Sequence, residues 1–142
     1  QKILNAINAN PYIVNYAGHG AGGLWAASTF FTSGNVSSLA NSNRSIFTML
    51  TCFNGYYLRT NADCLAEVLL KSSNGASMAW ASTTETTPDI QSIMADRFYK
   101  DINAGTIKRA GDLIKDAKQP ISGSDVGYSW ELLGDPAMKI VP

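Results

Sequence analysis

Three short apolar runs along the chain predict buried β-strands. They cover residues 12–17, 45–51 and 76–82. Each run is shorter than an ordinary helix and ends at or beside Gly, Ser or Thr, which are residues typical of turns. The polar segments that follow these runs are therefore expected to be loops that begin where each strand ends.

Apolar residues at helical spacing separate these strands. A short helix is predicted near residues 36–39 and a stronger one near residues 63–72. After the third strand, Pro88 is placed to begin a long helix that Gly105 ends, and another helix follows from Thr106. Strands that alternate with helices imply right-handed crossovers and a parallel sheet, so the fold class is α/β.

The two ends of the chain complete this prediction of one domain over residues 1–142. A Gly-Asp-Pro turn precedes an expected last short strand at residues 137–141. The first ten residues carry Ile3, Leu4 and Ile7 at helical spacing, a stripe that needs a partner on the sheet. Because this sheet is thin and a parallel sheet needs cover on both faces, we expect a further segment of the protein upstream. The strand at residues 12–17 should then be covered by an upstream fragment of the same precursor or by a second copy.

Composition and charge exclude several function classes. The 142 residues carry 11 Lys and Arg against 11 Asp and Glu, so there is no basic field for nucleic acid. No apolar run approaches the roughly 20 residues that span a bilayer. Charged residues make up only 15%, a composition found in exported bacterial proteins, and a secreted or cell-surface location is expected.

A single histidine and a cysteine follow two successive predicted strands. His19 lies in a Gly-His-Gly segment after the first strand, and Cys52 ends the second. Carboxyl ends of neighbouring parallel strands meet at one edge, with strands about 4.8 Å apart. His19 and Cys52 are therefore predicted to face one cleft, where a base activates a thiol and then protonates a leaving group. The alternative is a buried structural cysteine and a turn that contains a histidine.

Other residues near this edge have open interpretations. Backbone N–H groups of Gly20 and Cys52 are candidates for an oxyanion site. Cys64 is expected to be a buried helix residue with a free thiol, although its spacing also permits a disulfide with Cys52. Two cysteines are too few for a disulfide scaffold or a structural zinc site, and one histidine makes a poor transition-metal site, so no metal or cofactor is expected. The glycine-rich segment after His19 lacks the Lys-Ser/Thr ending of a phosphate loop.

Several segments together resemble the gingipain family of bacterial cysteine peptidases. They are NYAGHGAGGLW, then LTCFNGYY, CLAEVLL and GASMAWAS, and finally WELLGDPAMKI. The resemblance extends over nearly the whole chain. It implies a caspase-like three-layer sandwich with a mostly parallel sheet that lacks its first strands in this chain. It also implies a dyad of His19 and Cys52, with Gly20 at the oxyanion position.

The expected activity is hydrolysis of peptide bonds through a thioester acyl-enzyme on Cys52. The loop at residues 82–88 leaves the same edge of the sheet, so it is predicted to form one wall of the substrate cleft. Trp80 and Thr83 are expected to border the pocket there, and Glu85, with Asp89 next, to attract a basic side chain of a peptide or protein substrate. Solvated or helix-capping roles for both carboxylates are the alternative.

Three other functions stay open at this point. The family includes a sortase-like transpeptidase of the type IX secretion system, which uses the same dyad. An inactive caspase-like scaffold or binding module is a further possibility, against which the presence of both His19 and Cys52 argues. Sugar binding by Trp25, Trp80 and Trp130 is the weakest, because tryptophans more often pack in cores.

Overall fold

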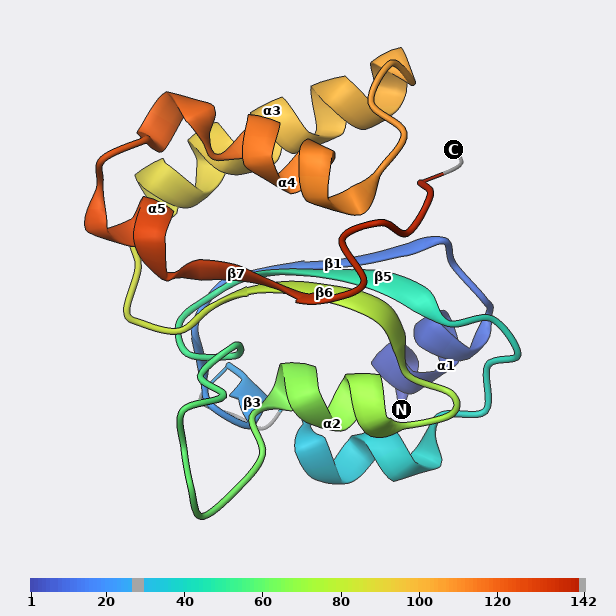
Figure 1. The fold of residues 1–142 in the computed structure, drawn as a ribbon. Coiled ribbons are helices and arrows are strands. Elements are labelled where there is room, and N and C mark those ends of the chain that lie inside the picture. Colours follow the sequence, from blue (N-terminus) through green and yellow to red (C-terminus); the bar gives the residue numbers. More distant parts are fainter. Residues whose placement is uncertain (27–29, 141–142) are drawn as a thin grey trace.

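The computed structural model describes residues 1–26 and 30–140, and its central feature is a four-stranded sheet (Figure 1). The strand order is β1-β5-β6-β7. The first three of these strands are parallel, and β7 is antiparallel to β6. Their bounds are β1 Ile13–Ala17, β5 Ser45–Leu50, β6 Ala76–Ser82 and β7 Trp130–Gly134.

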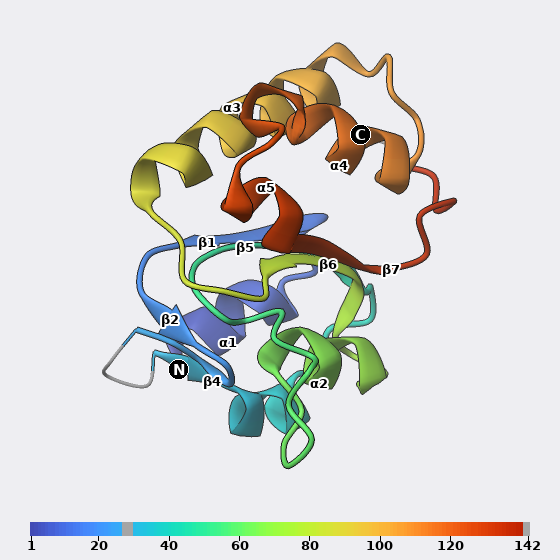
Figure 2. The ribbon, with the colours of Figure 1, turned by 60° about the vertical axis from the view of Figure 1, so that its left-hand side comes forward.

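Helices cover both faces of this sheet and make three layers (Figures 1 and 2). One layer contains α3 and α4, and the other contains α1, α2 and the 3₁₀ helix η1. The described helices are α1 Lys2–Asn8, η1 Ser33–Ser38, α2 Leu65–Lys71, α3 Pro88–Ala104, α4 Ala110–Ala117, η2 Gln119–Ile121 and α5 Asp125–Ser129. The α/β fold class and the mostly parallel sheet predicted from the sequence are thus confirmed.

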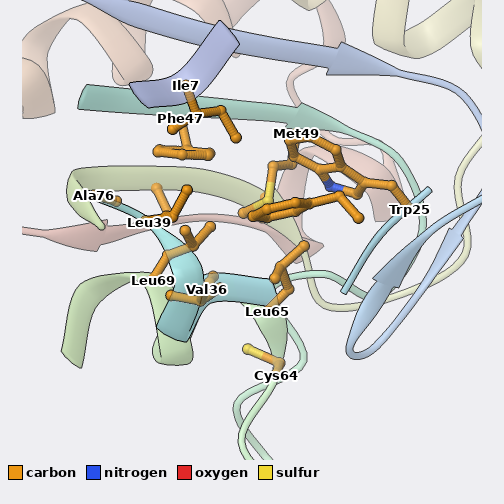
Figure 3. Close-up of a cluster of buried hydrophobic side chains, with 14 residues drawn as sticks. Ile7, Trp25, Val36, Leu39, Phe47, Met49, Cys64, Leu65, Leu69 and Ala76 are labelled. Carbon is orange, nitrogen blue, oxygen red and sulfur yellow. The ribbon is translucent and has the colours of Figure 1, made fainter. Parts of the chain in front are cut away.

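Apolar side chains from alternate strand positions fill the two spaces between the layers. Phe47 and Met49 of β5 point to the side of α2, where Leu65 and Leu69 are fully buried (Figure 3). The other cluster lies under α3 and α4 and contains Ile46, Met78, Trp80, Phe98, Leu113 and Trp130. Because all six residues of β5 are buried, the sheet is a two-sided core, and the side chains of this central strand are not available to solvent.

The register of the parallel strands brings their carboxyl ends to one edge. Ala17 of β1 pairs with Leu50 of β5, and Met49 of β5 pairs with Ala81 of β6. The pairing extends one residue past β1, where the Gly18 N–H donates to the Leu50 carbonyl at 3.1 Å. The loops that follow the three strands therefore begin side by side.

Three details differ from the sequence-based prediction. The last strand among the described residues is Trp130–Gly134 rather than residues 137–141. Residue 141 lies outside the described residues, and over residues 137–140 an isolated bridge joins Lys139 to Arg109. The fourth helix begins at Ala110, four residues after the predicted Thr106. A small antiparallel sheet of β2 Gly20–Ala21, β3 Leu24–Trp25 and β4 Phe31–Thr32 was not anticipated, because two-residue strands carry no periodicity.

Strand β1 lies at an edge of the described sheet, and α1 packs beside it. Ile7 is 2% exposed and belongs to the core cluster, with Ile3 and Leu4 packed against it. The apolar stripe of the first helix therefore finds its partner within the chain itself. Among the described residues, none of the helices combines the length and apolar character needed to cross a bilayer.

Candidate active site

The segment after β1 holds His19 at the carboxyl edge of the sheet. Its backbone is fixed on both sides, because the Tyr16 hydroxyl donates to the His19 carbonyl at 2.8 Å and the Ala26 N–H donates to the same oxygen at 2.8 Å. The His19 side chain remains exposed. This arrangement gives an accessible imidazole on a rigid backbone.

Cys52 is the second residue of the loop that follows β5, and its neighbours define an irregular turn. Phe53 has φ of 59°, a left-handed conformation that costs a non-glycine residue on the order of 1–3 kcal/mol. Hydrogen bonds to the loop after β6 hold this turn, from the Phe53 N–H to the Thr84 carbonyl at 3.1 Å and from the Gly55 N–H to the Ser82 carbonyl at 2.9 Å. The strained residue next to Cys52 is thus held from outside the turn.

His19 and Cys52 line the same pocket, whose volume is about 360 Å³. The Cys52 Sγ donates to the carbonyl of Thr86, another lining residue, at 3.7 Å. The complete lining is Ala17, Gly18, His19, Leu50, Cys52, Thr86, Pro88, Gln91, Ser92 and Ala95. The structure therefore brings together the two residues that the sequence singled out, at the tips of adjacent parallel strands.

Gly20 lies directly against the segment that carries Cys52. A β-carbon at this position would overlap Thr51 Oγ1, so only glycine lets the two backbones approach this closely. The buried Asn54 side chain joins the same two segments, because its Nδ2 donates to the Ala21 carbonyl at 2.6 Å and to the Leu24 carbonyl at 3.2 Å. The hairpin with Gly20 and the loop with Cys52 are one connected unit.

The loop at residues 82–88 contributes to the pocket, but not through the residues expected. Thr86 and Pro88 line it. Trp80, expected to border the pocket, is instead fully buried, with its ring 5.1 Å from that of Phe98 on the α3 side of the sheet. Thr83 is turned to α5, because its N–H and its hydroxyl both donate to the Ser129 carbonyl.

One carboxylate lies within this loop and another directly follows it. Glu85 is exposed and immediately precedes Thr86. Asp89 lies in the first turn of α3, where hydrogen bonds from the Thr87 side chain and the Ile90 N–H lower the pKa of its carboxyl. Asp89 is thus occupied with its own helix, and Glu85 is the remaining acidic candidate in the predicted loop.

Gln91 is a pocket residue that the sequence analysis did not identify. It is 7% exposed and shares a face of α3 with the buried Met94 and Phe98. Gln91 could have been found from the sequence, because it is a polar residue on an otherwise apolar stripe of the predicted helix.

Cys64 has a different environment from Cys52. It is 0% exposed at the start of α2 and does not form a disulfide, since both cysteines are free. Burial, opposed in part by hydrogen bonding, raises the pKa of its thiol to about 11, with a contribution from the Glu67 carboxylate. Cys64 is therefore a protonated packing residue at neutral pH, as expected from the sequence.

Two further observations delimit the site. Over residues 1–26 and 30–140, no three His, Cys, Asp or Glu side chains are grouped so that they could hold a metal ion. A larger pocket of about 510 Å³ lies between α4, α5 and β7, but it contains neither His19 nor Cys52. Of these two pockets, the one of about 360 Å³ is lined by both His19 and Cys52.

A mostly parallel sheet between two helix layers, with a histidine and a cysteine at adjacent strand tips, is the arrangement expected of a caspase-like cysteine peptidase. The model of peptidase family C25 matches residues 1–141. The chain belongs to peptidase family C25.

Curated relatives agree with this assignment. Gingipain R2 of Porphyromonas gingivalis is 26% identical to this chain over an alignment 156 residues long. The alignment covers 99% of this chain and 21% of that protein. Gingipain R1 of Porphyromonas gingivalis has the same identity over 99% of this chain and 16% of its own length. The chain thus spans about a fifth of the first of these relatives.

Solved structures show the same fold. The crystal structure of the Arg-specific cysteine proteinase gingipain R superposes with a TM-score of 0.83 at 23% identity, over 98% of this chain and 35% of that chain. A complex of Porphyromonas gingivalis RgpB pro- and mature domains gives a TM-score of 0.85 at 24% identity, over 96% and 36%. The caspase-like fold expected from the sequence is confirmed.

Proposed function

We propose that this chain carries the catalytic dyad of a cysteine endopeptidase, with Cys52 as nucleophile and His19 as general base and acid. The observation that carries the proposal is the shared pocket of about 360 Å³ at the ends of β1 and β5. Membership of peptidase family C25 agrees with this chemistry. Cys64 is excluded as the nucleophile by its burial.

The reaction proceeds in two halves. His19 takes the proton of the Cys52 thiol, and the thiolate attacks the scissile carbonyl carbon while the carbonyl π electrons move to oxygen. Backbone N–H groups of Gly20 and Cys52 stabilise this oxyanion. His19 then gives the proton to the leaving amine, which leaves a thioester on Cys52. Water, deprotonated by His19, hydrolyses the thioester and restores the thiol.

The wall formed by Thr86 and Pro88 orients the substrate. Backbone groups at Thr83 and Thr84 are already hydrogen-bonded, since the Thr83 N–H donates to Ser129 and the Thr84 carbonyl accepts from Phe53. The Glu85 carbonyl accepts from Thr84 Oγ1 at 3.0 Å, and the Thr86 carbonyl accepts from Cys52 Sγ at 3.7 Å. Main-chain pairing with a peptide substrate is therefore assigned to the N–H groups of Glu85 and Thr86. The pocket lining holds no carboxylate among the described residues, so Glu85 is the candidate partner for a basic side chain.

The partners we propose are a peptide or protein substrate and a polypeptide that covers the outer edge of β1. Beside this edge lies a mostly apolar pocket of about 300 Å³, lined by residues that include Val14, Tyr16 and Phe30, and Phe30 is 59% exposed. An upstream fragment of the same precursor or a second copy would cover it. We also propose a secreted or cell-surface location in a bacterium, by analogy with its relatives.

Substitution of the dyad tests this function directly. In the full-length protein, Cys52→Ala and His19→Ala should each lower the hydrolysis rate of peptidyl-arginine and peptidyl-lysine amides by about 10³-fold or more, whereas Cys64→Ala should keep most of the activity. Equal losses in the Cys52 and Cys64 variants, or full activity of Cys52→Ala, would overturn the proposal.

A further inference from the structure

One peptide group joins His19 to Gly20, and its carbonyl is held by two donors. The Tyr16 hydroxyl and the Ala26 N–H both donate to the His19 oxygen, each at 2.8 Å. The N–H at the other side of this peptide group belongs to Gly20. The same group of atoms thus joins the candidate base to a candidate oxyanion donor.

The direction of the Gly20 N–H follows from these bonds. Gly20 pairs with Trp25 across the β2–β3 hairpin, and the Ala26 N–H to His19 carbonyl bond makes this the non-hydrogen-bonded kind of antiparallel pair. In such a pair the N–H of Gly20 points away from the opposite strand. Because the peptide is trans, its N–H also points away from the carbonyl and from Tyr16.

Tyr16 is itself firmly placed. Its ring stacks on that of Trp25, with centroids 4.5 Å apart and planes at 11°, and Trp25 is only 2% exposed. Burial raises the pKa of the Tyr16 hydroxyl, so the group remains a protonated donor through the neutral range. A second close approach, of Gly20 to Thr51, fixes the other side of the peptide group.

We propose that Tyr16 is a positioning residue of the oxyanion site, whose hydroxyl orients and polarises the His19–Gly20 peptide group. This inference rests on the proposed function, because it takes the Gly20 N–H as an oxyanion donor. A hydrogen bond to the carbonyl of an amide strengthens that amide's N–H as a donor. The effect is largest when negative charge develops on the substrate oxygen.

Tyr16→Phe in the full-length protein removes this hydroxyl and keeps the ring stacked on Trp25. The matched control is Tyr99→Phe, which removes a hydroxyl bonded to Thr48 at 2.9 Å on the other side of the sheet. With a peptidyl-arginine amide as probe, Tyr16→Phe should lower kcat about 5- to 10-fold and leave KM within about twofold. Tyr99→Phe should change neither constant by more than about twofold.

Two reagents separate oxyanion stabilisation from general damage. A peptidyl-arginine aldehyde adds the Cys52 sulfur to its carbonyl carbon, and its oxygen then occupies the oxyanion position, so its inhibition constant should rise by the same factor as kcat falls. Iodoacetamide alkylates the same sulfur by displacing iodide and needs no oxyanion donor. In Tyr16→Phe, the rate constant for alkylation of Cys52 by iodoacetamide should therefore stay within about twofold of its value in the unsubstituted protein.

The outcomes are distinct. An alkylation rate that falls together with kcat would show that Tyr16 acts on the dyad or the fold and would overturn the inference, as would full activity of Tyr16→Phe. If the unchanged protein neither hydrolyses peptides nor forms the aldehyde adduct, the proposed function itself fails and the inference fails with it.

Discussion

At the scale of single residues, the two cysteines have the same side chain in two different environments, and we expect different chemistry from each. Cys52 lines an open pocket beside His19, whereas Cys64 is 0% exposed at the start of α2. This division was predictable, because Cys52 ends a strand and Cys64 precedes an apolar helical stripe. The position of the Trp80 side chain could not be predicted, because both faces of a central strand are buried and the sequence does not tell which face a side chain takes.

The raised pKa of Cys64 predicts a specific dependence of stability on pH. In the unfolded chain the thiol loses its proton near 9, but in the folded protein only near 11. Between these values the unfolded state binds fewer protons, so stability falls as pH rises. Cys64→Ala should cost about 1 kcal/mol at pH 8 through the lost packing. This difference should disappear or change sign at pH 10.5, as measured by chemical denaturation, and a difference that stays constant would contradict the assignment.

Glu85 is the residue of this chain that we expect to influence substrate specificity. Glu85→Gln should lower kcat/KM for substrates with Arg or Lys before the scissile bond by about 2- to 5-fold, because an exposed charge pair contributes little. Asp89→Asn is the matched control, since Asp89 bonds its own helix start. An unchanged preference in Glu85→Gln would place the specificity determinant elsewhere in the protein.

At the scale of elements, apolar runs located the sheet well. The three predicted parallel strands agree with β1, β5 and β6 to within one residue at each end. The last strand was misplaced because the Gly-Asp-Pro turn was read as its beginning, whereas β7 ends at Gly134. The β2–β3 hairpin was missed because it depends on contacts with Thr51 and Asn54, which are distant in sequence.

The close approach of the hairpin to the cysteine loop makes Gly20 a sensitive position. Gly20→Ala should lower both the melting temperature and the hydrolysis rate, because the added β-carbon meets Thr51 Oγ1. Adding Thr51→Ala should restore part of the melting temperature, a coupling that a double-mutant cycle measures.

Gly34→Ala is the control, since its β-carbon would make an ordinary contact 3.5 Å from Thr32 Oγ1. Strictly additive effects of Gly20→Ala and Thr51→Ala would rule out the proposed close approach.

At the scale of the whole molecule, the sheet has a buried centre and an edge strand, β1, beside an apolar pocket. Edge strands of this kind pair with other chains. The 142-residue chain expressed by itself should therefore self-associate or purify with a second polypeptide. Light scattering after size exclusion, with mass spectrometry of the eluted material, tests this. A stable monomer with no second chain would contradict it.

Covalent labelling shows whether Cys52 is a nucleophile that His19 activates. The full-length protein is treated at neutral pH with a peptidyl-arginine acyloxymethyl ketone, and the modified residue is located by peptide mass mapping. We predict one adduct, on Cys52, with a rate that falls at least about 100-fold in His19→Ala. An adduct on Cys64, or equal labelling of Cys52 with and without His19, would contradict the activation of Cys52 by His19.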